Sequence, residues 1–163
     1  MSVPMPSILN KLSWFSGLID GEGCFTLNII KQHTTALKVT PVFSIQMKNG
    51  EWIKDVLKIL NKLNIKHYHR ERKNQTEISV KHWKNILPFI RAIKPFSVVK
   101  RPLIERFLLY NPRPIRNRFI PTNPKIIIET ANFVDFVREF NRGKNRPYKW
   151  SRDTILNFFG KKK

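Results

Sequence analysis

Apolar side chains recur along this chain with a helical period in some segments and with a strand period in others. From Ser7 to Ile19 they have the spacing of the buried face of a helix, at Ile8, Leu12, Phe15 and Ile19. Ser7 is the expected N-cap of this helix, and Gly21 and Gly23 are expected to end it.

The next two segments alternate between apolar and polar residues, as half-buried strands do. They are Phe25–Lys31 and Lys38–Met47, and they are predicted to pair through a loop near residues 33–36. An amphipathic helix is predicted over Glu51–Leu63. A second hairpin follows, with strands at Lys66–Arg72 and Glu77–Lys81.

The rest of the chain is predicted to be mainly helical. The order of helix, hairpin, helix, hairpin and further helices indicates an α+β fold in a single domain over residues 1–163, with an extension at 1–6 and a basic tail at 160–163. Helices are expected at His82–Ile93, Pro102–Tyr110, Ile126–Asn141 and Asp153–Phe159, an irregular connector at Asn111–Pro124, and a basic loop at Arg142–Arg152.

The charge of the chain indicates its partner. Lys and Arg outnumber Asp and Glu by 31 to 11, which gives a formal net charge of +20. An excess of this size destabilises a compact state unless a polyanion neutralises it, and nucleic acid is the expected polyanion. An anionic membrane surface is the alternative partner. No apolar run reaches the roughly 18 residues of a spanning helix. The single cysteine, Cys24, excludes an internal disulfide framework and a cysteine-rich zinc site.

Residues 15–23 read Phe-Ser-Gly-Leu-Ile-Asp-Gly-Glu-Gly and place two carboxylates, Asp20 and Glu22, at the end of an apolar helix. The C-terminal end of a helix carries partial negative charge, so carboxylates are disfavoured there unless cations accompany them. A divalent metal with oxygen ligands, such as magnesium, would meet this need. The alternative is a polar turn in which Asp20 bonds nearby backbone.

Three small residues, Ser13, Gly17 and Gly21, stand four apart on the predicted helix. This spacing lets a helix approach a second copy of itself across a two-fold axis, although it also suits ordinary helix–sheet packing. Two-metal cleavage of phosphodiesters needs carboxylates around the metals that flank each scissile phosphate, and one chain offers one motif. That chemistry therefore requires a homodimer.

The string at 15–23 resembles the signature of the LAGLIDADG homing endonucleases. For members with one motif per chain, the resemblance implies a symmetric homodimer whose α-β-β-α-β-β-α cores set a saddle-shaped antiparallel sheet in the DNA major groove. The implied activity is a magnesium-dependent double-strand break with short 3′ overhangs in a long, pseudo-palindromic site, which promotes intron or intein mobility. Manganese is expected to substitute for magnesium, and calcium to support binding without cleavage.

The same resemblance implies roles for the motif residues. Glu22 would bind the catalytic metal, the carbonyl of Gly21 would also ligate it, and Asp20 would be structural, capping and bracing the helix pair. Lys100, which follows Pro95-Phe96, matches the family's catalytic-pocket lysine. A solvated surface lysine is the alternative for Lys100.

The family also places a polar, water-positioning residue at the end of the second strand. The segment Gln46-Met47-Lys48-Asn49 lies there, and Asn49 or Gln46 is the candidate, with Lys48 as a further contributor.

If Glu22 points at DNA, strand alternation assigns its companions on the same face. Arg, Asn, Gln and Glu among them can read base edges, although any exposed sheet face is also polar. In the basic loop, Lys144 and Arg146 are expected to contact phosphates. The companions are Cys24, Thr26, Asn28, Ile30, Gln32, Lys38, Thr40, Ser44, Gln46, Lys48, Tyr68, Arg70, Arg72, Glu77, Ser79 and Lys81.

Two other functions would keep the basic surface and lose the need for metal. They are an RNA maturase that assists intron splicing, and a non-cleaving DNA-binding module on the same fold. The expected partners are therefore double-stranded DNA and a second copy of the chain, or intron RNA for a maturase. The N-terminus lacks the features of a secretory signal, so an intracellular location is expected. Residues with A/T-rich codons point to a mitochondrion or chloroplast, and an archaeal or bacterial cytoplasm is the alternative.

Overall fold

The computed structural model describes residues 7–32, 36–110, 124–141 and 149–160. Its elements follow the predicted α+β order, with boundaries shifted by a few residues. They are α1 (Ile8–Glu22), β1 (Gly23–Gln32), β2 (Ala36–Lys48), α2 (Trp52–Lys62), β3 (Tyr68–Glu71), β4 (Gln75–Lys81), α3 (Trp83–Ile93), α4 (Arg101–Leu109), α5 (Pro124–Phe140) and α6 (Arg152–Gly160).

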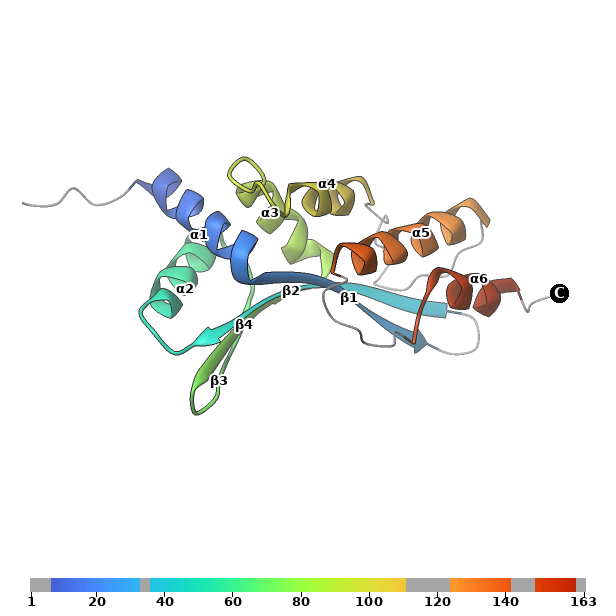
Figure 1. The fold of residues 1–163 in the computed structure, drawn as a ribbon, viewed down its shortest axis with the longest axis horizontal. Helices are drawn as coiled ribbons and strands as arrows, with labels where there is room; N and C mark the ends of the chain where they lie inside the picture. The colour runs from blue at the N-terminus through green and yellow to red at the C-terminus, as the bar shows by residue number, and fades with distance from the viewer. Residues whose placement is uncertain (1–6, 33–35, 111–123, 142–148, 161–163) are drawn as a thin grey trace, which may run out of the picture.

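The four strands form one antiparallel sheet in the order β1-β2-β4-β3. The described helices lie along one face of this sheet, and none of them covers the other face (Figure 1). The register sets Cys24 opposite Ser44, Ser44 opposite Ser79, and Ser79 opposite Tyr68. The uncovered face, called the open face below, therefore carries side chains from all four strands in aligned rows.

The core fills the space between the sheet and the helices. Phe25, Phe43 and Phe89 are fully buried, and their ring centroids are 4.8 to 6.3 Å apart. A second, smaller cluster packs α5 and α6 against the far end of the β1–β2 hairpin, where Leu37 and Ile155 are fully buried. Alternation in the two long strands supplies the apolar side of both clusters.

The ends of α1 differ in how well the sequence predicted them. Ser7 is the N-cap as expected, and its hydroxyl accepts the backbone N–H of Asn10 at 3.3 Å. The prediction that Gly21 ends the helix is wrong, because α1 continues through Glu22 and its C-cap is Gly23. A Cβ on Gly23 would lie 2.6 Å from the Ile19 carbonyl oxygen, so glycine lets the chain pass directly from helix to strand.

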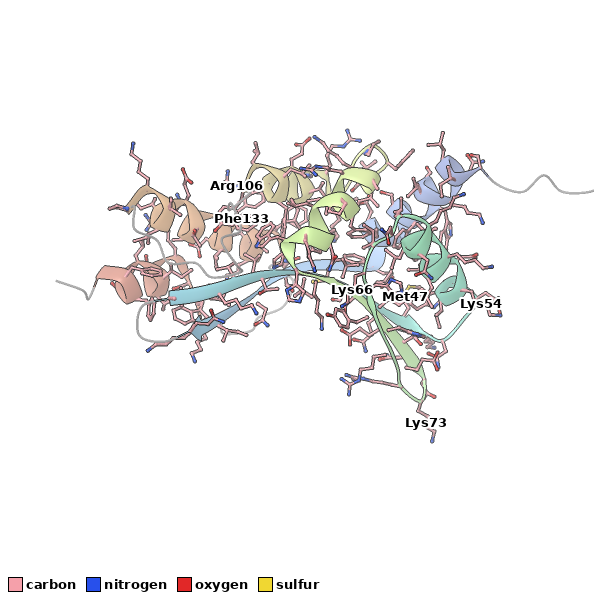
Figure 2. The ribbon with its side chains drawn as sticks, turned by 180° about the vertical axis from the view of Figure 1, so that it is seen from behind. Met47, Lys54, Lys66, Lys73, Arg106 and Phe133 are labelled. Carbon is pink, nitrogen blue, oxygen red and sulfur yellow. The ribbon has the colours of Figure 1, made fainter. Side chains whose placement is uncertain are left out.

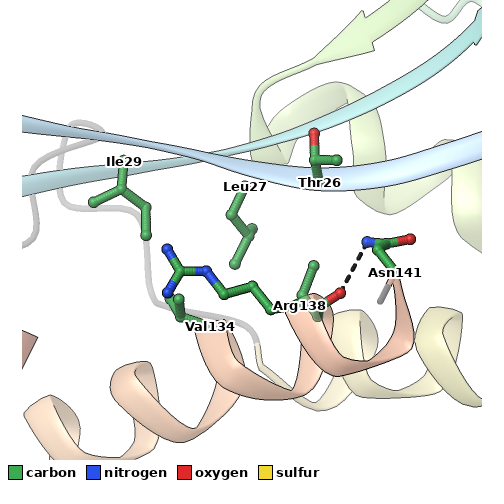
Figure 3. Close-up of a pocket in the computed structure, with 7 residues that line it drawn as sticks. Thr26, Leu27, Ile29, Val134, Arg138 and Asn141 are labelled. Carbon is green, nitrogen blue, oxygen red and sulfur yellow. Dashed lines mark hydrogen bonds between the residues drawn. The ribbon is translucent and has the colours of Figure 1, made fainter. Parts of the chain in front are cut away.

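A cavity of about 50 Å³ lies between α5 and β1, lined partly by Leu27, Val134 and Arg138 (Figure 3). The Asn141 side chain closes α5 onto the strand, because its amide donates to the Phe25 carbonyl at 2.7 Å and to the Val137 carbonyl at 2.8 Å. A space of this size holds a few waters at most and marks imperfect packing under β1.

Several predicted segments fall outside the described residues. These are the extension at 1–6, most of the loop at 33–36, the connector up to Asn123, and most of the basic loop with Lys144 and Arg146. Arg152, predicted as the end of that loop, is instead the first residue of α6, and Gly160 of the predicted tail is the last. No helix in the described part of the chain is long and apolar enough to cross a membrane.

Candidate nucleic-acid interface and catalytic site

The carboxylate of Asp20, at the end of α1, accepts four hydrogen bonds from the segment that precedes α4. Its Oδ1 accepts from the Ser97 hydroxyl at 2.6 Å and the Lys100 backbone N–H at 3.0 Å. Its Oδ2 accepts from the backbone N–H groups of Val98 at 2.7 Å and Val99 at 3.1 Å. These donors lie 77 to 80 residues away in sequence, so the alternative of a local polar turn does not describe Asp20.

These bonds resolve the electrostatic conflict of a carboxylate at a helix C-terminus. Burial raises the pKa of Asp20, but the hydrogen bonds from Ser97, Val98, Lys100 and Val99 outweigh it, so the pKa lies below its usual value. The carboxylate is thus fixed in its charged form and joins the end of α1 to the start of α4.

Glu22 is the last residue of α1 and is exposed. Gly21 lies in the same final turn, where backbone carbonyls lack intrahelical donors. A carboxylate and a carbonyl are oxygen donors that suit magnesium, which is usually held by one or two carboxylates together with waters and substrate phosphates. The described residues contain no group of three or more His, Cys, Asp or Glu side chains that could hold a metal. Within one chain, these donors therefore fit a magnesium site completed by substrate or by a second copy.

The small residues of α1 lie on an uncovered side of the helix. A Cβ added to Gly17 or Gly21 would meet nothing within 4 Å, and Ser13 is exposed. Packing of this face against the chain's own sheet, the alternative left open by the sequence, is therefore not observed. Leu9 and Trp14 are also exposed on α1, at 59% and 45%, which leaves this helix with an apolar, small-residue surface.

Lys100 is brought to the motif through its backbone, by the bond to Asp20. Its ammonium lies 6.0 Å from the centroid of the Phe140 ring, at the end of α5. Asn141 follows Phe140 directly, and its side-chain amide donates to the Phe25 carbonyl in β1. Lys100 thus lies among segments that meet where α1 passes into β1, which is the region of Glu22.

The two candidates for positioning water have different surroundings. Gln46 is exposed on the open face, and its amide N–H donates to the Gln75 amide oxygen at 2.7 Å. In Asn49, the side-chain oxygen accepts from the buried Thr76 hydroxyl at 2.7 Å, and the amide nitrogen donates to the Arg72 carbonyl at 3.4 Å. Asn49 therefore ties the β2 end to the β3–β4 turn.

The register also places Gln46 close to the motif. Gly23, the residue after Glu22, pairs with Ile45, the residue before Gln46. Lys48 is exposed farther along the same strand, opposite Gln75. The alternation of Gln75 with Glu77 could have revealed Gln75 as a further open-face residue, which the sequence reasoning missed.

The predicted companions of Glu22 that lie within the strands share the open face. Their rows include Gln46, Glu77 and Arg70, which are paired across β2, β4 and β3. Thr40 and Ser79 are buried, at 7% and 4% exposure. Arg72 lies beyond the end of β3, so it belongs to the turn.

Each row of the open face runs across neighbouring strands. In addition to the row just described, the register aligns Cys24, Ser44, Ser79 and Tyr68; Thr26, Val42 and Lys81; Asn28 and Thr40; Ile30 and Lys38; and Gln32 and Ala36.

Comparison with known proteins identifies a family model and a set of folds. The model described as LAGLIDADG endonuclease matches residues 15–100. No curated protein sequence matches the chain. The structure of I-CvuI with the I-CreI target is 18% identical, with a TM-score of 0.75 over 94% of this chain and 95% of that chain.

Two further solved structures are similar over most of the chain. The archaeal, intron-encoded I-Vdi141I complexed with DNA is 20% identical, with a TM-score of 0.64 over 93% of this chain and 95% of that one. The group I intron-encoded I-CeuI complexed with DNA is 16% identical, with a TM-score of 0.64 over 98% and 79% of the two chains. At these identities, the likeness establishes the fold.

Proposed function

Because the chain belongs to the LAGLIDADG endonuclease family, a family of DNA endonucleases, we propose that it is a homodimeric, magnesium-dependent homing endonuclease. It makes double-strand breaks with short 3′ overhangs in a long, pseudo-palindromic site, and so promotes the mobility of an intron or intein. The observation that carries this proposal is the bonding of Asp20 to residues 97–100. These hydrogen bonds join the end of α1, which carries the exposed Glu22, to the segment that contains Lys100, at one edge of the open face.

The residues around that edge have complementary tasks in hydrolysis. Glu22 and the Gly21 carbonyl would hold magnesium, which would supply positive charge to the scissile phosphate and increase the acidity of water. The Lys100 ammonium stabilises negative charge that develops on the phosphate. Gln46 orients the attacking water by hydrogen bonding, since it follows Ile45, the strand partner of Gly23, and has an exposed side chain.

A second copy of the chain supplies the second acid. The open surface at Gly17 and Gly21 allows two α1 helices to approach closely across a two-fold axis. Such packing brings two Glu22 side chains together at the centre of the dimer, so that each strand of DNA is cut once. The exposed Leu9 and Trp14 add apolar area that this contact would bury.

Double-stranded DNA is the substrate that this surface supports. The open face carries aligned rows of Arg, Asn, Gln, Glu and Lys side chains, which can read base edges in the major groove. The net charge of +20 favours binding to the phosphate backbone. Complexes of I-CvuI with DNA were obtained in the presence of magnesium and of calcium, which supports divalent metal use in this fold.

A cleavage screen tests the proposal. A plasmid library of randomised and intron-insertion sites is incubated with the wild type and with Glu22→Gln, in magnesium and in calcium. The matched control is Glu51→Gln, an exposed acid at the start of α2. We expect cuts at one site in magnesium for the wild type and the control, with binding but no cutting for Glu22→Gln.

Two results would overturn the proposal in different ways. Binding without cleavage by the wild type would indicate a DNA-binding module. Binding of intron RNA without DNA cleavage would indicate a maturase. Undiminished cutting by Glu22→Gln would instead reject the assigned role of Glu22.

A further inference from the structure

The side chain of Lys100 contacts an aromatic ring of α5, a helix that follows it by two dozen residues. The backbone of Lys100 is held on both sides, because its N–H bonds Asp20 and its carbonyl accepts the Ile104 N–H at 2.9 Å. Its four-carbon stem is flexible, so the backbone bonds alone leave the ammonium free to sample several positions. The Phe140 ring, with its centroid 6.0 Å from the ammonium, makes a cation–π contact with this mobile part.

The Phe140 ring is itself held in place. It is partly buried against the main core and lies near Phe136, one turn earlier in α5, with the two ring centroids 6.4 Å apart. The next residue, Asn141, donates to the Phe25 carbonyl in β1 at 2.7 Å. The strand β1 begins directly after Glu22. The end of α5 is therefore attached to the strand that continues from the motif helix.

An aromatic joint between α4 and α5 fixes the two helices relative to each other. Tyr110 and Phe133 stack, with ring centroids 4.1 Å apart and an interplanar angle of 16°. The Arg106 guanidinium of α4 lies 5.7 Å from the centroid of another α5 ring. Figure 2 labels Arg106 and Phe133 on these neighbouring helices. Because Lys100 is the N-cap of α4, this joint also holds Lys100 close to Phe140.

We propose that Phe140 is a positioning residue for the candidate site, which acts through Lys100 by restricting its ammonium to one region beside the motif. The inference rests on the proposed function, in which Lys100 stabilises negative charge on the phosphate. An ammonium that is held in place before the reaction loses little freedom as the transition state forms, so more of its stabilisation appears in the rate. Phe140 lies beyond residues 15–100, which match the family model. The inference therefore gives the C-terminal helices a task in the reaction.

The test removes the ring while keeping apolar packing, with Phe140→Leu, and keeps the ring with Phe140→Tyr. The matched control is Phe158→Leu in α6, because that partly buried ring also has a lysine ammonium, that of Lys31, 5.5 Å from its centroid. Single-turnover cleavage of the site found in the library screen is measured in magnesium, and DNA affinity in calcium. Urea unfolding gives a temperature at which every variant is folded.

The expected effect is on rate and not on binding. Phe140→Leu should cleave about tenfold more slowly than the wild type at unchanged DNA affinity, and Phe140→Tyr should restore the rate to within about twofold. Phe158→Leu should cleave at the wild-type rate. In the free protein, the NMR signals of the Lys100 ε-methylene protons should lie upfield of their position in Phe140→Leu, because the ring shields them, and Phe158→Leu should leave them unmoved.

Four results would overturn the inference while leaving the nuclease proposal intact. They are wild-type cleavage by Phe140→Leu, equal slowing by Phe158→Leu, a loss of DNA affinity in place of rate, and Lys100 signals that do not move when the ring is removed. A wild type that cuts no site in magnesium would overturn both proposals.

Discussion

The Asp20 carboxylate accepts the Lys100 backbone N–H at 3.0 Å, which joins two parts of the candidate site that lie 80 residues apart in sequence. The motif acid closest to Glu22 therefore positions the lysine segment, rather than facing solvent. Ser97, fully buried, donates to the same carboxylate oxygen at 2.6 Å. The geometry of the site thus depends on the charge state and shape of one side chain.

Asp20→Asn should weaken both the fold and the site. An asparagine offers one acceptor oxygen, and its amide N–H₂ would face backbone N–H groups that now bond Oδ2. We expect a loss of about 2–4 kcal/mol in the free energy of unfolding, measured with urea, because hydrogen bonds to charged groups are strong and unpaired N–H groups are costly. Asp55→Asn, an exposed acid on α2, is the control. Equal, small losses in both variants would show that the Asp20 bonds contribute little.

The contribution of Asp20 should also depend on pH. Its pKa is lower in the folded protein than its ordinary value, so its stabilisation is present above the unfolded pKa of about 3.9 and is lost as pH falls through the folded pKa. The difference in unfolding free energy between the wild type and Asp20→Asn should therefore be constant near neutral pH and shrink below about pH 4. Urea titrations across this range measure it, and other carboxylates cancel in the difference. A difference that stays constant at acid pH would contradict the prediction.

Gly17→Leu should separate folding from dimer formation. A side chain at Gly17 points into open space within one chain, and leucine has a higher helix propensity than glycine, by roughly 0.5–1 kcal/mol. The folded monomer should therefore be at least as stable as in the wild type. In a dimer packed through α1, the same side chain would hold the helices apart. Sedimentation should show a shift toward monomer, and Asn61→Leu on the exposed side of α2 should show none.

The sequence predicted local features of this fold well, because they depend on neighbouring residues. The alternation in β1 and β2 identified both the buried side at Phe25 and Phe43 and the open side at Thr26 and Ser44. The sequence also correctly placed the small residues of α1, Ser13, Gly17 and Gly21, on a different side of the helix from its buried apolar residues. These patterns follow from the periods of helix and strand alone.

Tertiary contacts account for what the sequence did not predict. Of the two glycines predicted to end α1, Gly21 lies inside its last turn and only Gly23 is the C-cap, where the Ile19 carbonyl and the Phe43 ring leave no room for a Cβ. Thr40 is buried although strand alternation assigns it to the open face. The partners of Asp20 lie in a segment that no local pattern connects to it. Each of these three features depends on which residues from distant parts of the chain come into contact. The spacing of apolar residues along the sequence carries no information about such contacts.

Gln46→Ala should lower activity and leave stability almost unchanged, whereas Asn49→Ala should lower stability and leave activity almost unchanged. Asn49→Ala removes the acceptor of the fully buried Thr76 hydroxyl, so it should cost about 1–3 kcal/mol of unfolding free energy. Gln46 is exposed and bonds only another exposed side chain among the contacts described, Gln75. Its loss should change stability by less than about 0.5 kcal/mol.

Cleavage of the site found in the library screen gives the second measurement. If Gln46 orients the attacking water, Gln46→Ala should slow cleavage by about tenfold to a hundredfold at unchanged DNA affinity, since misplacing a reactant costs rate rather than binding. Asn49→Ala should cleave at close to the wild-type rate at a temperature where it remains folded. A fully active Gln46→Ala together with a folded, inactive Asn49→Ala would transfer the water-positioning role to Asn49. The distinction follows from hydrogen bonding: the Asn49 oxygen already accepts from the buried Thr76 hydroxyl, whereas the exposed Gln46 side chain bonds the exposed Gln75 through its amide nitrogen.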